Sequence, residues 1–128
     1  MILLDTHVFI CLVNGDENLS EKYLIFLKEE ENKYLSIISC WEISLLLKKE
    51  RIKIKYSFDE WIHNALKAYN VEIINLNLDI ILAYHQLDDF HSDPADNLIT
   101  ATSICINIPL LTFDKKLIEF KGLNTLKI

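Results

Sequence analysis

Residues 1–15 have the sequence MILLDTHVFICLVNG, in which a short apolar run ends at an acid and a second apolar run follows. The first run, Ile2–Asp5, is predicted to be a buried strand, because a continuous apolar run suits a strand covered on both faces. The second run, Thr6–Asn14, is predicted to be a helix that Asn14-Gly15 ends. A buried strand that leads directly into a helix is typical of a parallel α/β fold.

The same alternation of strand and helix continues along the chain. Further strands are predicted at 34–38, 72–76, 109–112 and, at the end, 124–127. Helices are predicted at 20–31, 39–50, 57–69, 78–87, 93–105 and 115–120. Strands separated by helices imply βαβ units. We therefore expect one domain over residues 1–128, an α/β fold in which an α/β/α sandwich surrounds a mainly parallel sheet.

Composition limits the classes of function. The chain has 128 residues, 51% of them apolar, which is enough for one core. Two glycines are too few for a Gly-rich phosphate loop, so any phosphate chemistry must depend on side chains and metals. The net charge of -6 counts against simple electrostatic binding of nucleic acid, unless bound cations cancel part of it. The three cysteines lack metal-ligand spacing and are expected to be buried thiols.

The sequence also bears on the location of the protein. Its beginning lacks the basic flank and the cleavage site of a signal peptide. Its apolar stretches are far shorter than the roughly 20 residues that a membrane span needs. We therefore expect a cytoplasmic protein that does not contact a membrane.

Four acids lie where predicted strands end or where the next helix begins. Asp5 ends the first strand, and Asp114 follows the strand at 109–112. Glu42 and Asp96 lie in the predicted first turns of the helices at 39–50 and 93–105. Because ligands bind beyond the carboxyl ends of parallel strands, we expect all four acids at one edge of the sheet.

Such a cluster of acids has an electrostatic consequence. Two like charges about 4 Å apart repel by roughly 4 kcal/mol at an effective dielectric constant near 20. Either some of the acids are protonated or a divalent cation binds. Ligands that are all oxygen suit Mg²⁺ or Mn²⁺ better than zinc.

Each acid also has a purely structural interpretation. Asp5 and Asp114 can cap the helices that follow them. Glu42 can complete a capping box that begins at Ser39, and Asp96 suits the positive end of a helix dipole. The four acids together favour a metal site, because all of them fall on the same predicted edge.

Four sequence blocks resemble a known family. In the order and spacing found here, they resemble PIN-domain ribonucleases, and in particular VapC-type toxins of toxin–antitoxin pairs, over nearly the whole chain. The blocks are LLDTH at 3–7, SCWEI at 39–43, DPADNLITAT at 93–102 and LLTFD at 110–114. Close relatives often carry a D-P-F-D-R pattern in the third block, where this chain has Ala95 and Asn97. That difference affects a basic substrate contact and not the metal site.

The resemblance implies hydrolysis of RNA phosphodiesters by a metal-activated water. Asp5 and Asp96 are the candidate direct ligands of Mg²⁺ or Mn²⁺, and Glu42 and Asp114 are candidates for outer contacts or for orienting the water. Three further residues are candidates to support these acids through hydrogen bonds: Thr6, Asp93 and Thr112. Asp93 is expected mainly to cap the helix that Pro94 opens. The resemblance also implies a cognate antitoxin and a homodimer.

Basic residues suggest a path for the substrate. Candidates for RNA contact are Lys48, Lys49, Arg51, Lys115 and Lys116. The run around Lys48 has the alternative interpretation of a solvated helix end, where cations are favourable. His7 is expected to face the surface of its helix, and no role as a base is assigned to it.

Three other functions stay open on the sequence. One is a phosphoaspartate protein, a receiver or a phosphatase, although His7 stands where the phosphatase pattern has its second Asp. Another is a non-catalytic binding module in which the acids serve only as helix caps. The third is a zinc site formed by His85, Asp88, Asp89, His91 and Asp93, which a polar loop between two helices explains without a metal.

Overall fold

Four short strands and seven helices make up the part of the chain that the computed structural model describes, residues 1–87 and 93–127. The strands are β1 (Ile2–Leu4), β2 (Lys33–Ser36), β3 (Val71–Ile74) and β4 (Leu110–Leu111). The helices are α1 (Thr6–Asn14), α2 (Glu21–Glu29), α3 (Ile37–Lys48), α4 (Phe58–Ala68), α5 (Leu78–Gln86), α6 (Pro94–Ile106) and α7 (Lys115–Ile118).

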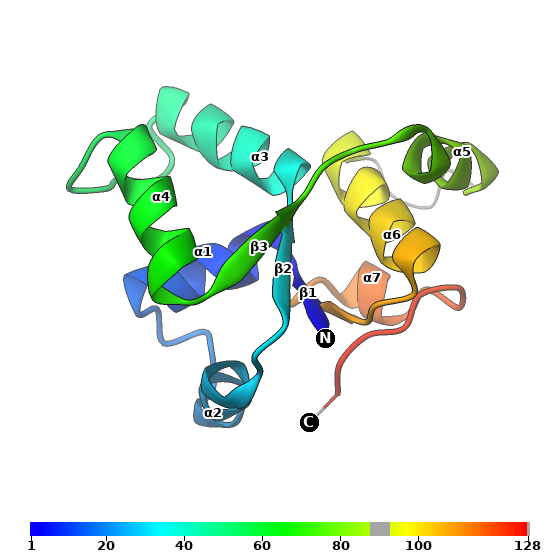
Figure 1. Ribbon diagram of the computed structural model, residues 1–128, viewed down its shortest axis with the longest axis horizontal. Coiled ribbons are helices and arrows are strands. Elements are labelled where there is room, and N and C mark those ends of the chain that lie inside the picture. Colours follow the sequence, from blue (N-terminus) through cyan, green and yellow to red (C-terminus); the bar gives the residue numbers. More distant parts are fainter. Residues whose placement is uncertain (88–92, 128) are drawn as a thin grey trace.

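The strands form one parallel sheet in the order β3-β2-β1-β4. Helices α1, α3 and α4 lie on one side of this sheet, and α5, α6 and α7 lie on the other (Figure 1). The predicted α/β sandwich with a parallel sheet is therefore confirmed. From β1 the sheet grows to β2 on one side and to β4 on the other, and such a switch in strand order opens a crevice at the carboxyl ends of the strands.

Alternating side chains of β1 divide the core in two. Ile2 and Leu4 pack with Phe9 of α1 in one cluster, whereas Leu3 packs with Ile99 of α6 in the other. All five side chains are fully buried. Because both faces of the strand are covered, β1 has the uninterrupted apolar sequence that its position requires.

The junction between β2 and α3 differs from the prediction. The strand ends at Ser36 and the helix begins at Ile37, so Ser39 lies inside the helix and does not cap it. Ser36 is the cap, and its hydroxyl accepts a hydrogen bond from the Ile38 backbone N–H at 3.1 Å. Glu42 consequently lies in the second turn of α3, and its interpretation as part of a capping box is wrong.

Other differences are smaller. The predicted final strand at 124–127 is reduced to one bridge between Leu110 and Thr125. Cys11 is buried as expected, but Cys40 is half-buried and Cys105 is exposed. None of the helices in the described part of the chain is long and apolar enough to cross a membrane.

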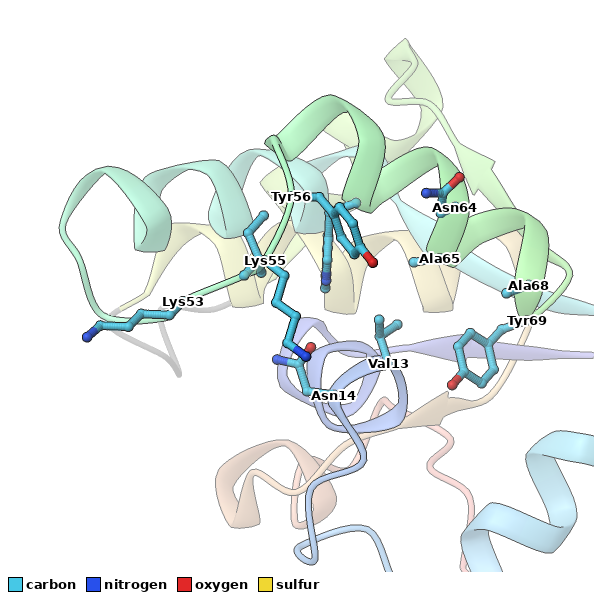
Figure 2. A pocket seen from close by; sticks show the side chains of 11 residues that line it. Val13, Asn14, Lys53, Lys55, Tyr56, Asn64, Ala65, Ala68 and Tyr69 are labelled. Carbon is cyan, nitrogen blue, oxygen red and sulfur yellow. The ribbon is translucent and has the colours of Figure 1, made fainter.

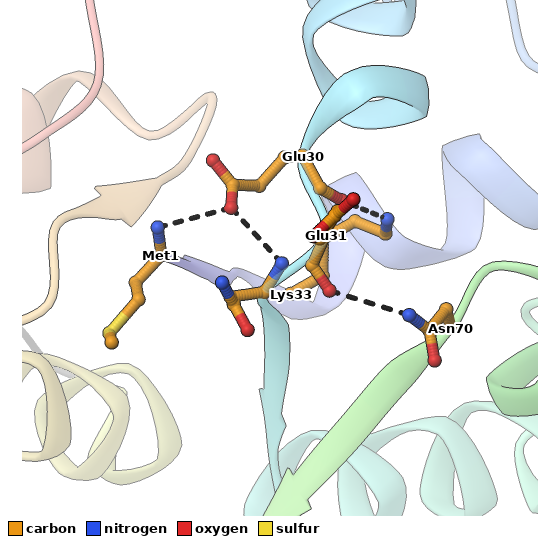
Figure 3. A network of polar contacts seen from close by, with 6 residues as sticks. Met1, Glu30, Glu31, Lys33 and Asn70 are labelled. Atoms are coloured by element: carbon orange, nitrogen blue, oxygen red, sulfur yellow. Dashed lines mark hydrogen bonds and ion pairs between the residues drawn. The ribbon is translucent and has the colours of Figure 1, made fainter.

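A polar network holds the amino ends of three neighbouring strands (Figure 3). The amino group of Met1, before β1, forms an ion pair with Glu30 at 3.2 Å. The buried Lys33 ammonium donates to the Glu30 backbone oxygen, and Asn70, before β3, donates to the Glu31 backbone oxygen. These contacts lie at the end of the sheet opposite the carboxyl edge, where the acids are found.

Candidate metal centre

Asp5 is fixed where β1 ends and α1 begins. It is 5% exposed, and both of its carboxylate oxygens accept hydrogen bonds. Oδ1 accepts from the Thr6 backbone N–H at 2.8 Å, which caps α1, and Oδ2 accepts from the Thr112 hydroxyl at 2.6 Å. Thr112 directly follows β4, the neighbour of β1, so the sheet brings the two residues together.

A hydrogen bond from the first residue of α1 holds the Glu42 carboxylate in place. The Thr6 hydroxyl donates to Glu42 Oε1 at 2.6 Å and also lies 2.8 Å from the Ser39 hydroxyl oxygen. Thr6 and Ser39 are both fully buried, which restricts the rotamers available to this contact. Through Thr6, the end of β1 therefore orients a carboxylate that belongs to α3.

Three carboxylates meet beside this contact. Glu42, Asp93 and Asp96 each offer an oxygen, and these oxygens all lie within 4.8 Å of one another. Asp93 also caps α6, because its Oδ1 accepts from the Ala95 backbone N–H at 2.9 Å. Its expected role as a cap is thus present, and the same side chain joins the carboxylate group.

The donor set fits a small hard cation. In octahedral coordination with metal–oxygen distances near 2.1 Å, ligand oxygens lie about 3 Å apart when adjacent and about 4.2 Å apart when opposite. The carboxylate oxygens of this group lie within 4.8 Å of one another, so each side chain would have to move by about one ångström or less to reach those distances. The three side chains are half-buried, which leaves room for such a movement. Three carboxylates without nitrogen or sulfur suit Mg²⁺ or Mn²⁺.

Asp114 and Asp96 share a second part of the site with Asp5. All three line one cavity of about 540 Å³. Asp114 also caps α7, since its Oδ1 accepts from the Lys116 backbone N–H at 2.9 Å, and its own N–H donates to the Thr112 hydroxyl at 3.1 Å. Asp96 belongs both to this cavity and to the three-carboxylate group, and so lies between the two parts.

The electrostatics of the site oppose further negative charge. Burial raises the pKa of Asp5, and the charge of Asp114 adds to that effect, while hydrogen bonds from Thr112 and Thr6 lower it. Burial also raises the pKa of Glu42, and the charges of Asp93 and Asp5 contribute in the same direction. A cation bound among these groups would remove the penalty and hold them ionised.

A neighbouring cavity extends from the acids along α3. It has a volume of about 440 Å³ and is lined by Glu42 and Asp93 at one end and by Lys49 and Arg51 at the other. The exposed side chain of His7 lines both this cavity and the cavity of Asp5, so it lies on the surface, as expected, at the edge of the site. Its position two residues after Asp5 was the available signal.

A larger cavity lies elsewhere. It has a volume of about 620 Å³ between the end of α1 and α4, where Lys55, Tyr56 and Tyr69 surround Val13 (Figure 2). The described residues that line it include no acid. Because metal chemistry needs the carboxylates, we assign the candidate site to the smaller cavities beside them.

The structure thus brings together five of the predicted acids and their two threonines: Asp5, Glu42, Asp93, Asp96, Asp114, Thr6 and Thr112. Of the predicted basic residues, Lys49 and Arg51 line a cavity of the site. Lys48, Lys115 and Lys116 are exposed and are not among the described residues that line either cavity. The suggested zinc cluster includes Asp88, Asp89 and His91, which lie outside the described residues.

Comparisons with known proteins bear on the family and the fold. A family model described as PIN domain matches residues 2–123. The fold is similar to VapBC2 from Rickettsia felis bound to a DNA fragment from their promoter, with a TM-score of 0.74, 21% identity and 98% of each chain covered. It is also similar to a toxin–antitoxin complex from Klebsiella pneumoniae, with a TM-score of 0.69, 21% identity and coverage of 98% and 97%. No curated protein matches the sequence.

Proposed function

Because the chain belongs to the PIN-domain family, we propose that it is a metal-dependent endoribonuclease and the toxin component of a toxin–antitoxin pair. The observation that carries this proposal is the group formed by Glu42, Asp93 and Asp96, whose carboxylate oxygens lie within 4.8 Å of one another. Asp5 and Asp114 face the adjoining cavity, which shares Asp96 with this group. RNA is the proposed substrate.

The proposed division of work follows from the contacts. Glu42, Asp93 and Asp96 would hold Mg²⁺ or Mn²⁺, with Asp5 beside them. When bound, such an ion lowers the pKa of water and stabilises charge that develops on phosphoryl oxygens. Thr6 keeps the Glu42 carboxylate turned toward the group, and Thr112 keeps Asp5 in place. Asp114, which lines the cavity of Asp5 and Asp96, would orient the attacking water.

The proposed partner is an antitoxin protein. Two solved structures with this fold, one of VapBC2 and one of a toxin–antitoxin complex, match 98% of this chain. The cavity between α1 and α4 has an apolar floor beside two lysines, which suits a protein segment with apolar and acidic side chains. We further propose that the protein works in the cytoplasm as a homodimer.

The phosphoaspartate alternative has less support. A phosphoacceptor aspartate needs a carboxylate oxygen that is accessible to the phosphoryl donor. Asp5 is 5% exposed and both of its oxygens accept short hydrogen bonds. A role for the acids only as caps does not account for Glu42, which caps no helix and accepts from Thr6.

Cleavage of labelled RNA by the purified protein tests the nuclease proposal. Wild type should cut in Mg²⁺ or Mn²⁺, whereas Asp96→Asn should lose at least about 100-fold in rate, because a charged ligand of the cation is removed. Asp79→Asn, the same change on an exposed residue of α5, is the matched control. Equal rates for Asp96→Asn and wild type would refute the assignment.

Expression in a bacterial host tests the toxin proposal separately. The wild-type chain should halt growth, and Asp96→Asn should not. Cleavage in vitro without any effect on growth would support the nuclease proposal and refute the toxin proposal.

A further inference from the structure

A cavity of about 440 Å³ runs along α3 away from the acids. One end is formed by Glu42 and Asp93, and the other by Lys49 and Arg51. Its remaining described lining is His7, Trp41, Leu45, Leu46, Ile52 and Ala95. The cavity therefore joins the carboxylate group to two cations across an apolar floor.

Trp41 is the exceptional residue of this lining. Its side chain is 56% exposed, although an indole of this size gains much from burial. The other tryptophan, Trp61, is 7% exposed and packs edge-on against Phe9 in the core. The described core of the molecule thus buries one indole and leaves the other at the cavity beside the acids.

Helical spacing sets the order of groups along the cavity. Trp41, Leu45 and Lys49 are four residues apart along α3 and its end, so they follow one face of the helix. Glu42 and Lys49 are seven residues apart, which is about 10 Å along the axis at 1.5 Å per residue. Along α3, the Lys49 end of the cavity therefore lies about two helical turns from the Glu42 end.

We propose that this cavity is a nucleotide subsite of the enzyme, in which a base beside the scissile phosphate stacks on Trp41. A phosphate of the same strand is held by Lys49 and Arg51. The inference rests on the proposed function, because the subsite adjoins the carboxylates that would cut the strand. Bases stack on exposed aromatic rings irrespective of sequence, and guanidinium groups bind phosphate through paired N–H donors.

The position of this cavity beside the carboxylates favours RNA over a protein segment as the occupant. A base placed on Trp41 covers the apolar floor of Leu45 and Ile52, while the strand carries its phosphates toward Arg51. In a chain of net charge -6, these two basic residues place positive charge beside the cavity, where a polyanion would have to approach.

The first test is tryptophan fluorescence with a short single-stranded RNA and Mg²⁺, in the cleavage-inactive Asp96→Asn protein. RNA should quench the exposed Trp41, and iodide should quench it before RNA is added and not after. Trp41→Phe in the same background should remove the signal and keep the binding. Trp61 is buried and supplies the unquenched remainder.

The second test is steady-state cleavage by otherwise wild-type protein. Trp41→Leu, which keeps an apolar group without the ring, should raise KM about 5-fold to 150-fold, the range of stacking on one base. Trp41→Phe should stay within about 3-fold of wild type. Arg51→Gln should also raise KM and weaken its dependence on salt, whereas Lys67→Gln on the exposed face of α4 should change neither.

Several outcomes would overturn the inference and leave the nuclease intact. One is wild-type KM in both Trp41→Leu and Arg51→Gln. Another is an indole that iodide cannot reach without RNA, together with conversion of a dimer to monomers by Trp41→Leu, which would make this face a protein interface. If the wild-type protein cuts no RNA at all, the proposed function fails first and the subsite fails with it.

Discussion

Glu42→Gln should stabilise the metal-free protein and abolish its response to Mg²⁺. The amide keeps the size of the side chain and can still accept the hydrogen bond from Thr6, so the change removes chiefly the charge. In metal-free protein that charge lies among other acids, and burial together with Asp93 and Asp5 raises its pKa. The substitution therefore separates charge from shape.

The magnitude follows from the distance. Two unit charges 4.8 Å apart repel by about 3.5 kcal/mol at an effective dielectric constant of 20, and by about 0.9 kcal/mol in bulk water. Solvent screens part of this repulsion because the side chains are only half-buried, and the hydrogen bond from Thr6 weakens when its acceptor becomes neutral. We expect a net gain of about 1–2 kcal/mol in the free energy of unfolding, or about 3–8 °C in Tm.

The assay is thermal unfolding in EDTA and then with increasing Mg²⁺. Wild type should gain about 2.7 kcal/mol when Mg²⁺ reaches 100 times its Kd, and Glu42→Gln should gain little, so the order of stability reverses. Glu72→Gln, the same change on an exposed residue of β3, is the control and should behave as wild type. A Glu42→Gln protein that is less stable in EDTA and still responds to Mg²⁺ would refute the reasoning.

Three further predictions concern the same site. In EDTA, the Tm advantage of Glu42→Gln over wild type should shrink as pH falls from 7 toward about 4.5. The reason is that the pKa of Glu42 is raised in the folded wild type, so this side chain takes up a proton over that range and the repulsion is relieved. An advantage that is constant with pH would show that charge is not its origin. Thr112→Val should cost about 1–2 kcal/mol in the free energy of unfolding and slow cleavage, because a buried hydrogen bond to Asp5 is lost; unchanged unfolding and rate would contradict this. EDTA should stop cleavage and Mn²⁺ should restore it, and activity that survives thorough metal removal would point to another mechanism or to a contaminant.

The fold could be predicted from sequence because its strands and helices have distinct patterns. The uninterrupted apolar run before Asp5 and the Asp93-Pro94 helix start each admit one local structure, and both predictions are confirmed. The sequence predicts the start of α3 at Ser39, two residues too late, because Ile37 and Ile38 are β-branched residues that continue a strand pattern. Both Ser36 and Ser39 can cap a helix, and only tertiary contacts decide between them.

The sequence predicted which acids belong to the site, and it predicted less well which of them lie next to one another. That the acids gather at the carboxyl edge follows from parallel strands. Which of them touch depends on rotamers: Asp93 joins Glu42 and Asp96, whereas Asp5 is turned toward Thr112. The exposure of Trp41 could not be predicted from sequence either. An apolar helix face does not indicate which of its residues pack into the core and which stay exposed.

The most direct test of the metal centre is an anomalous difference map from crystals soaked in Mn²⁺. We expect a peak about 2.1 Å from carboxylate oxygens of Glu42, Asp93 and Asp96, absent in crystals of Asp96→Asn. A well-ordered site with no peak after soaking, or a peak only at acids elsewhere on the surface, would contradict the account.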